Sequence, residues 1–320
     1  MASAGQDSEQ GRAPAPRKSS EAQPAPDFAT RLKSLALMAV VKGPMLLPYR
    51  QRLSVVAWLM TWVVSPVAGY KKRIRDNLAY ACPDLPEEEV KRLCKEVPAN
   101  VGRILVEMAS GQEFFDQLAD IEPEGPGFAA AEEARTEGRP IVFACGHFGS
   151  FHAARYCFVQ RGYKVGALYR PVDDPMLDQY FREMLESIEG PVFARSRRGL
   201  AQMLRYLRQG NCLAILLDQY VNKGAPVTFF GKTAPTSLSG AEMALKYNAL
   251  LIPVHGIREG KSFRVFVDDA IPHSDPVIMT QAINDSLETQ VRQHMEQWLW
   301  IHRRWKPERQ RKRAAAKIGP

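Results

Sequence analysis

Alternation between short β-rich segments and helical segments over residues 140–302 is the strongest constraint on how this chain can fold. The expected strands cover residues 141–145, 164–169, 192–194, 212–217, 250–255 and 263–268. The expected helices cover residues 151–160, 175–186, 198–208, 239–247 and 280–302. An alternation of this kind predicts an α/β fold, in which helices flank the faces of a central sheet.

A histidine follows the first of these strands. Gly146-His147-Phe148-Gly149 stands between the strand at 141–145 and the helix at 151–160. An imidazole titrates near working pH, and the framing glycines would let a substrate approach closely. His147 is therefore a candidate general base, and the alternative is a histidine packed in a loop or in the core.

Two more polar side chains follow strands of the same predicted sheet. Arg170 could bind a phosphate or a carboxylate, or form a surface ion pair. Asp218 could orient a base, bind substrate hydroxyls or cap a turn. Because ligands of α/β sheets bind beyond the carboxyl ends of the strands, we expect His147, Arg170 and Asp218 to line one cleft.

A loop rich in Gly, Ser and Thr precedes the helix expected at 239–247. It follows Phe229-Phe230-Gly231 and contains Thr236. Backbone amides at the start of that helix could hold an anion.

The N-terminal part of the chain has a different character. Residues 1–28 are rich in Ala, Pro, Ser and Gln, and we expect them to be disordered. Two apolar segments follow, at 35–41 and 53–64, each shorter than the ~20 residues that span a bilayer. Their tryptophans and cationic flanks favour helices that lie in a membrane interface, and a buried helical hairpin is the alternative. Residues 90–108 are expected to form an amphipathic helix behind an acidic first turn.

Charge and cysteine usage narrow the possible partners. The formal net charge is +8, and residues 303–317 hold eight cationic side chains against Glu308 alone. A basic segment of this kind attracts anionic surfaces, or is a solvated terminus. Nucleic-acid binding is disfavoured, because no binding motif is present and the charge is terminal. Five cysteines without a CxxC pair or a metal-ligand cluster indicate reduced thiols in a cytoplasmic setting.

Taken in order, these elements resemble the bacterial lipid A late acyltransferases of the lysophospholipid acyltransferase superfamily. The resemblance covers about residues 30–308. It is carried by Gly146-His147-Phe148-Gly149, Tyr169-Arg170-Pro171, Asp218-Gln219, Phe229-Phe230-Gly231, the Thr236–Gly240 loop and Trp298-Leu299-Trp300-Ile301-His302-Arg303-Arg304-Trp305-Lys306.

The resemblance implies a mixed, glycerolipid-acyltransferase-like sheet and transfer of a fatty acyl group to a lipid hydroxyl or amine. The donor would be acyl carrier protein or acyl coenzyme A, without metal or other cofactor. The enzyme would be peripheral or monotopic at the cytoplasmic face of the bacterial inner membrane. The expected organisation is a tail at 1–28, membrane-associating helices at 29–120, an acyltransferase domain at 121–305 and a basic tail at 306–320.

Mapped onto this chain, the resemblance makes His147 the base, with an Asp or Glu expected five positions later. His152 stands there instead. A neutral imidazole could accept a hydrogen bond but cannot supply the negative charge that stabilises an imidazolium. Three outcomes stay open: another carboxylate such as Asp218 takes the role, the acceptor is more reactive, or the protein is a degenerate acyltransferase that binds lipid or acts as a scaffold.

Other site residues are expected beside this pair. The predicted substrate-binding residues are Arg170, Asp218, Gln219, Phe230, Gly231 and Thr236. The tryptophans at 298, 300 and 305 are interleaved with cations, which would suit an interfacial anchor, or they pack the last helix.

Overall fold

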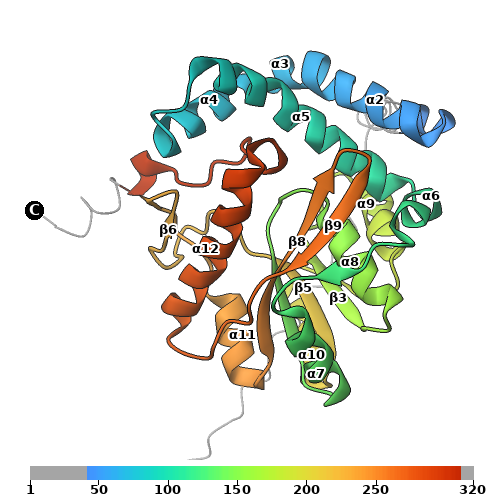
Figure 1. Cartoon of the computed structure of the whole chain (residues 1–320), viewed down its shortest axis with the longest axis vertical. Coiled ribbons are helices and arrows are strands. Elements are labelled where there is room, and N and C mark those ends of the chain that lie inside the picture. Colours follow the sequence, from blue (N-terminus) through green and yellow to red (C-terminus); the bar gives the residue numbers. More distant parts are fainter. Residues whose placement is uncertain (1–41, 311–320) are drawn as a thin grey trace, which may run out of the picture.

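A seven-stranded sheet forms the centre of the computed structural model, which describes residues 42–310 (Figure 1). Its strand order is β1-β9-β8-β2-β5-β3-β4. The strands are β1 (Pro123–Glu124), β2 (Ile141–Cys145), β3 (Val165–Tyr169), β4 (Val192–Ala194), β5 (Cys212–Leu216), β8 (Leu250–Glu259) and β9 (Ser262–Val267). Neighbouring strands are parallel except for the antiparallel hairpin of β8 and β9. The predicted α/β fold with a mixed sheet is confirmed.

Helices cover both faces of the sheet. They are α7 (Phe128–Thr136), α8 (Phe151–Gln160), α9 (Pro175–Glu186), α10 (Arg197–Arg208), α11 (Ser239–Tyr247) and α12 (Pro276–Gln293). Side chains of β2 alternate between the two faces: Phe143 and Cys145 pack with α7 and α8, and Val142 and Ala144 pack with α10, α11 and α12. Both faces of β2 are therefore buried, as expected for a central parallel strand.

The end of the last helix differs from the prediction. The segment 280–302 was expected to be helical throughout, but α12 ends at Gln293 and a short 3-10 turn, η4 (Met295–Gln297), follows. Trp298 then forms a β-bridge with Phe148 beside His147. The helix ends here, and the apolar residues that follow it, Trp298 and Trp300, are buried beside the loop that carries His147.

The three tryptophans of this C-terminal segment belong to the core. Trp298, Trp300 and Trp305 are at most 1% exposed. They pack around Phe229 of a small hairpin, β6 (Thr228–Phe229) and β7 (Lys232–Thr233). The prediction that these tryptophans form an interfacial anchor is therefore wrong, because none of the three rings reaches the surface.

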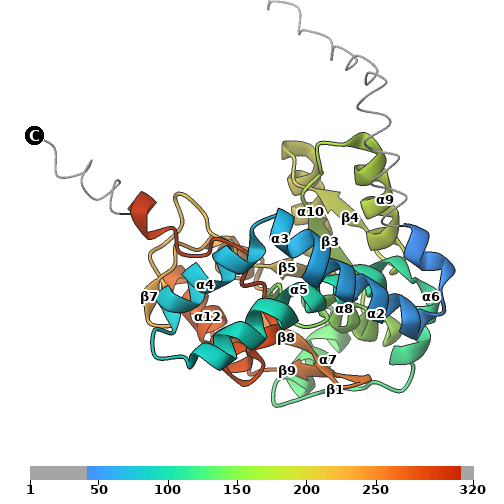
Figure 2. The same ribbon diagram turned by 90° about the horizontal axis from the view of Figure 1, so that it is seen from above.

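An arm of N-terminal helices arches across one end of the sheet (Figures 1 and 2). It consists of η1 (Gly43–Leu46), α2 (Tyr49–Leu59), the π-helical turn η2 (Met60–Val64), α3 (Ser65–Val67), α4 (Tyr70–Ala81), α5 (Glu87–Ala109), α6 (Gln112–Phe115) and η3 (Asp116–Leu118). Helix α5 confirms the amphipathic helix predicted at 90–108, with three glutamates in its first turn. The apolar segment predicted at 35–41 lies outside the described residues, and the domain boundaries stay predictions.

No single helix in the described part of the chain is long and apolar enough to cross a membrane. The segments Tyr49–Val67 and Tyr70–Ala81 meet the requirements of length and composition only together, and they are bent by 85°. The arm still exposes large apolar side chains along its outer side, namely Leu46, Val55, Trp58, Trp62, Val63 and Val67.

Candidate active site

Of the three strand-end residues predicted to line one cleft, His147 and Asp218 are in contact. Strands β2 and β5 are parallel neighbours with Cys145 opposite Leu216, so the residues two positions beyond each strand lie side by side. His147 Nδ1 is 2.6 Å from Asp218 Oδ1, and the backbone N–H of His147 donates to Asp218 Oδ2 at 2.8 Å. The carboxylate thus fixes both the ring and the backbone of the histidine.

This pairing leaves the other ring nitrogen of His147 free for chemistry. An ionised carboxylate only accepts hydrogen bonds, so Nδ1 carries the proton and Nε2 keeps its lone pair. The amide nitrogen of Gln219 lies 3.3 Å from Nε2 as a donor. The His147 side chain is 22% exposed while Asp218 is buried. A buried carboxylate behind a half-buried imidazole is the arrangement of a general base.

The charges of the pair stabilise each other. Burial lowers the pKa of His147, but the charge of Asp218 and its hydrogen bond outweigh burial, and the net pKa is raised. Burial raises the pKa of Asp218, but His147 and Trp298 more than offset this and hold it well below its usual range. The structure therefore favours an ionised Asp218 beside an imidazole that readily takes up a proton.

A tryptophan 80 residues further along the chain completes the carboxylate's surroundings. The indole Nε1 of Trp298 donates to Asp218 Oδ2 at 2.9 Å. Together with the backbone N–H of His147, it gives this oxygen two donors, which prevents the carboxylate from rotating away from the imidazole. Trp298 is a positioning residue that sequence reasoning missed, because it was read as an anchor or as packing of the last helix.

Replacing Trp298 by phenylalanine is expected to lower kcat about tenfold or more, because Asp218 loses one of its two donors on Oδ2. Trp300→Phe is the matched control: its equally buried indole donates to the Met295 carbonyl instead. Each variant should lose about 1–3 kcal/mol of unfolding free energy. Steady-state kinetics and denaturant titrations check both, and equal losses of kcat would contradict the positioning role.

The loop that carries His147 is held from behind by β8 and by η4. The N–H groups of Gly149 and Ser150 donate to the carbonyls of Gln297 and Gly256, at 2.9 and 2.6 Å. Gly149 has φ of +52°, and a Cβ there would lie 1.9 Å from the Gly256 oxygen. This glycine is required by close packing against β8 rather than by approach of a substrate.

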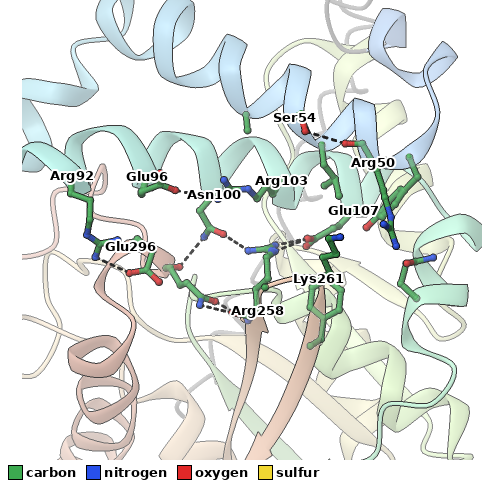
Figure 3. Close-up of a pocket in the computed structure, with 17 residues that line it drawn as sticks. Arg50, Ser54, Arg92, Glu96, Asn100, Arg103, Glu107, Arg258, Lys261 and Glu296 are labelled. Atoms are coloured by element: carbon green, nitrogen blue, oxygen red, sulfur yellow. Dashed lines mark hydrogen bonds and ion pairs between the residues drawn. The ribbon is translucent and has the colours of Figure 1, made fainter.

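A buried polar cluster connects this loop to the arm (Figure 3). The guanidinium of Arg258 on β8 pairs with Glu107 of α5 and also donates to the Asn100 side chain. Asn100 Nδ2 donates to the Gln297 carbonyl at 3.1 Å, and the Gln297 amide bonds the backbone of Arg258. The cluster lines a cavity of about 750 Å³ between α2, α5 and the β8–β9 hairpin, which neither His147 nor Asp218 lines. No short sequence motif indicates this cluster, because its members on α5 are more than 150 residues from Arg258 and Gln297.

The position five residues after His147 does not supply its partner. His152 is 5% exposed within α8, and its Nε2 has no hydrogen-bond partner. Burial and the nearby Arg155 guanidinium lower the pKa of His152 to about 3, so this ring is neutral. Of the alternatives left open by the sequence, the structure favours Asp218 and corrects the expectation that His152 pairs with His147.

The remaining predicted residues divide into two groups. Gln219 lies at Nε2 of His147, and Arg170 is exposed just after β3, the neighbour of β5 at the same end of the sheet. Phe230 and Gly231 instead form the turn of the β6–β7 hairpin, both with positive φ; Phe230 is buried and Gly231 is exposed. Thr236 is fully buried; its hydroxyl accepts from the Arg304 guanidinium and donates to the Ala234 carbonyl. The structure does not bring these three to His147.

Comparison with known proteins places this site in a family. Residues 26–307 match the model of the bacterial lipid A biosynthesis acyltransferases. A lipid A biosynthesis acyltransferase of Haemophilus influenzae is 23% identical over 79% of this chain and 81% of its own length. A phosphatidylinositol mannoside acyltransferase of Mycobacterium tuberculosis is 24% identical over 56% of this chain and 58% of its own.

Among solved structures, the chain is similar to the 1-acyl-sn-glycerophosphate acyltransferase of Thermotoga maritima. The TM-score is 0.35 at 13% identity, over 78% of this chain and 99% of that one. Since the family model spans most of the sequence, this chain belongs to the bacterial lipid A biosynthesis acyltransferase family.

Proposed function

We propose that this protein transfers a fatty acyl group from the thioester of acyl carrier protein or coenzyme A to a hydroxyl or amine of a membrane lipid. The observation that carries the proposal is the His147–Asp218 pair at the carboxyl end of the sheet. A charged carboxylate behind the imidazole supports an active enzyme over a lipid-binding scaffold, because it stabilises the imidazolium that a general base becomes.

One ring nitrogen, Nε2 of His147, carries out both proton transfers of the proposed reaction. Nε2 of His147 takes the proton of the acceptor O–H or N–H as the acceptor attacks the thioester carbonyl. The tetrahedral intermediate then collapses, the carbon–sulfur bond breaks, and the imidazolium returns the proton to the leaving thiolate. Asp218 stays ionised throughout and stabilises the imidazolium between the two proton transfers.

The exposed side of the arm supports a place on the membrane surface. Trp58 and Trp62 lie one helical turn apart and are each 57% exposed, beside Val55 and Val63. Tryptophan-rich apolar helices of this kind insert into the interface of a bilayer. The names of the relatives refer to lipid A biosynthesis and to a phosphatidylinositol mannoside. These names support an acyl acceptor that is embedded in a bilayer. We place the protein at the cytoplasmic face of the bacterial inner membrane.

Removing the two exposed rings should detach the protein from bilayers. Trp58→Ser/Trp62→Ser is expected to lower partition onto lipid vesicles about tenfold or more, because each ring gives up on the order of 1–2 kcal/mol of burial. The matched control is Val277→Ser/Ile278→Ser on α12, where the apolar side chains are also exposed. Vesicle flotation measures the effect, and a loss shared by both variants would count against the arm.

The proposed reaction is tested by lipid mass spectrometry. Cells that lack the gene are complemented with the wild type, His147→Ala or His152→Asn. One acylated lipid is expected to vanish on deletion and to return with the wild type and with His152→Asn, whose position the structure separates from the pair. Return of that lipid with His147→Ala would overturn the proposal, and the identity of the lipid would name the acceptor.

A further inference from the structure

A second cavity, of about 860 Å³, lies between the start of α4 and the segment that follows the buried tryptophans. Five cationic side chains and two carboxylates line it. They are Lys72, Arg73, Arg303, Lys306 and Arg309, with Asp76 and Glu308. Three of these cations belong to the basic stretch that the sequence singled out and that the acyl-transfer step does not use.

Most of this positive charge has no internal counterion. Lys72 pairs with Asp76 at 2.9 Å, on the exposed surface. Within residues 42–310, no carboxylate forms an ion pair with Arg73, Arg303, Lys306 or Arg309. Burial, together with the like charges of Arg309 and Arg303, lowers the pKa of Lys306. Cations that crowd one another in a cavity are stabilised when an anion binds between them.

The walls of the cavity are fixed to each other. Asn77 of α4 donates from one amide nitrogen to the carbonyls of Trp300 and His302, at 2.6 and 2.8 Å. Lys306 has a φ of +46°, which a residue with a side chain adopts only where its surroundings hold it. The backbone segments that carry the cations are therefore held in place relative to each other, which lowers the entropy lost when a ligand binds.

On one side of the cavity, a short path of contacts leads towards the catalytic pair. Lys306 Nζ lies 4.4 Å from the centre of the Tyr220 ring, and the Tyr220 N–H donates to His302 Nε2. Tyr220 follows Gln219, whose amide lies at Nε2 of His147. Only two residues thus separate the lining of the cavity from the general base along this path.

On its other side the cavity adjoins the apolar arm. Gly69, at the bend between α3 and α4, lines it, and Val67 just before the bend is 88% exposed. With the apolar side of the arm in a bilayer, the bend and the cavity lie at the depth of the lipid headgroups. Phosphate is the anionic group that every glycerophospholipid carries at that depth, and guanidinium and ammonium groups are its usual partners.

We propose that this cavity binds the phosphate of a membrane lipid headgroup and holds that lipid beside Nε2 of His147. The lipid is either the acyl acceptor or a neighbouring phospholipid, and both present the same chemistry. The inference deepens the proposed function by giving the acceptor side of the reaction a headgroup site. Binding itself does not require acyl transfer, so the two can fail separately.

The test compares two charge-matched double variants of the full chain, both carrying His147→Ala to prevent turnover. Arg73→Gln/Lys306→Gln removes two cations of the cavity. Lys164→Gln/Arg208→Gln removes two exposed cations that precede β3 and β5 in the sequence. They therefore lie towards the end of the sheet opposite to His147. The probes are vesicles of digalactosyldiacylglycerol, a neutral lipid without phosphate, that contain either phosphatidic acid or an equal surface charge of oleate, whose headgroup also lacks phosphate.

The cavity variant is expected to bind phosphatidic acid vesicles about tenfold more weakly, with a change of less than about twofold on oleate vesicles. The control variant should change less than about twofold on both. Lys306→Arg should retain binding, which separates loss of the site from loss of folding. Equal losses of binding on both kinds of vesicle, or in both double variants, would be explained by diffuse attraction between the cations and an anionic surface. Either result would overturn the proposed phosphate site.

Further measurements identify which lipid supplies the phosphate, and test whether the cavity binds an acidic protein instead. With His147 intact, a raised KM for the acceptor at unchanged kcat assigns the phosphate to the acceptor. Weaker vesicle binding at unchanged KM assigns it to a neighbouring phospholipid. Retained binding to phosphatidic acid, with lost binding to purified acyl carrier protein, would overturn the proposal in favour of an acidic protein partner.

Discussion

Replacing His147 by alanine is expected to lower kcat by about 10⁴-fold or more, the largest effect of any single substitution in this protein. The variant loses both the proton acceptor for the attacking hydroxyl or amine and the proton donor for the leaving thiolate. Substrate binding does not use Nε2, so KM should change little. Single-turnover assays with an acyl thioester and vesicles of the acceptor lipid measure the chemical step directly.

His152→Ala is the matched control for this experiment. It removes a second imidazole from the same loop-to-helix segment, but one that is buried, neutral and without a partner on Nε2. It should cost stability rather than chemistry, with kcat within about tenfold of the wild type at temperatures where the variant is folded. Comparable losses in both variants would mean that the segment, and not the His147 imidazole, carries the effect.

Asp218→Asn is expected to lower kcat by about 10³–10⁴-fold. An asparagine can present its amide N–H₂ to Nδ1 of His147, which leaves the proton on Nε2 and removes the base. The substitution keeps the shape of a side chain that Trp298 and the His147 backbone already hold, so folding should survive. Circular dichroism and thermal unfolding provide the check that the variant is native.

The pH profile separates this effect from general damage. The base must be neutral, so activity rises as pH passes upward through the pKa of His147, which lies above the usual histidine value in the wild type. Without the charge of Asp218, burial alone remains and lowers that pKa. The acid limb of kcat/KM should therefore move to lower pH in Asp218→Asn. A limb that stays in place would show that Asp218 does not act on His147.

The free energy of unfolding should also depend on pH through Asp218. The pKa of Asp218 is depressed on folding, so its contribution to the free energy of unfolding is present above the unfolded value and is lost as pH falls below it. In the wild type this gives a loss of stability on the acid side, which Asp218→Asn should lack.

His147 and Asp218 could each be predicted as residues of the site because strand ends depend on local signals, but the sequence paired His147 with His152 and left Asp218 as one alternative. Short apolar runs predicted strands at the correct places, and two of these strands, β2 and β5, have a polar residue, His147 or Asp218, two positions beyond their ends. In a sheet whose neighbouring strands are parallel, such residues meet at one edge wherever the strands come to lie. That β2 and β5 are neighbours, which brings Asp218 rather than His152 to the His147 ring, is known only from the structure.

The rest of the site depends on contacts between distant parts of the chain. Trp298 and its neighbours have the composition of an interfacial helix, and nothing local shows that they are buried under the loop of His147. Phe230 and Thr236 have the composition of a ligand loop, but Arg304 and Trp300 fill the space around them. His152 stands at the position where the resemblance implies a carboxylate partner for His147. The carboxylate that contacts the His147 ring is instead Asp218, which follows another strand.

The hydrogen bond between Trp298 and Asp218 also sets an order of events during synthesis. The donor emerges from the ribosome 80 residues after the acceptor, and the segment around it also closes the loop of His147. The apolar arm is complete long before that moment. Under the proposed function, the arm can therefore reach a bilayer while the His147–Asp218 pair is still unaligned, so that the proposed reaction with thioesters begins only after the arm is in place.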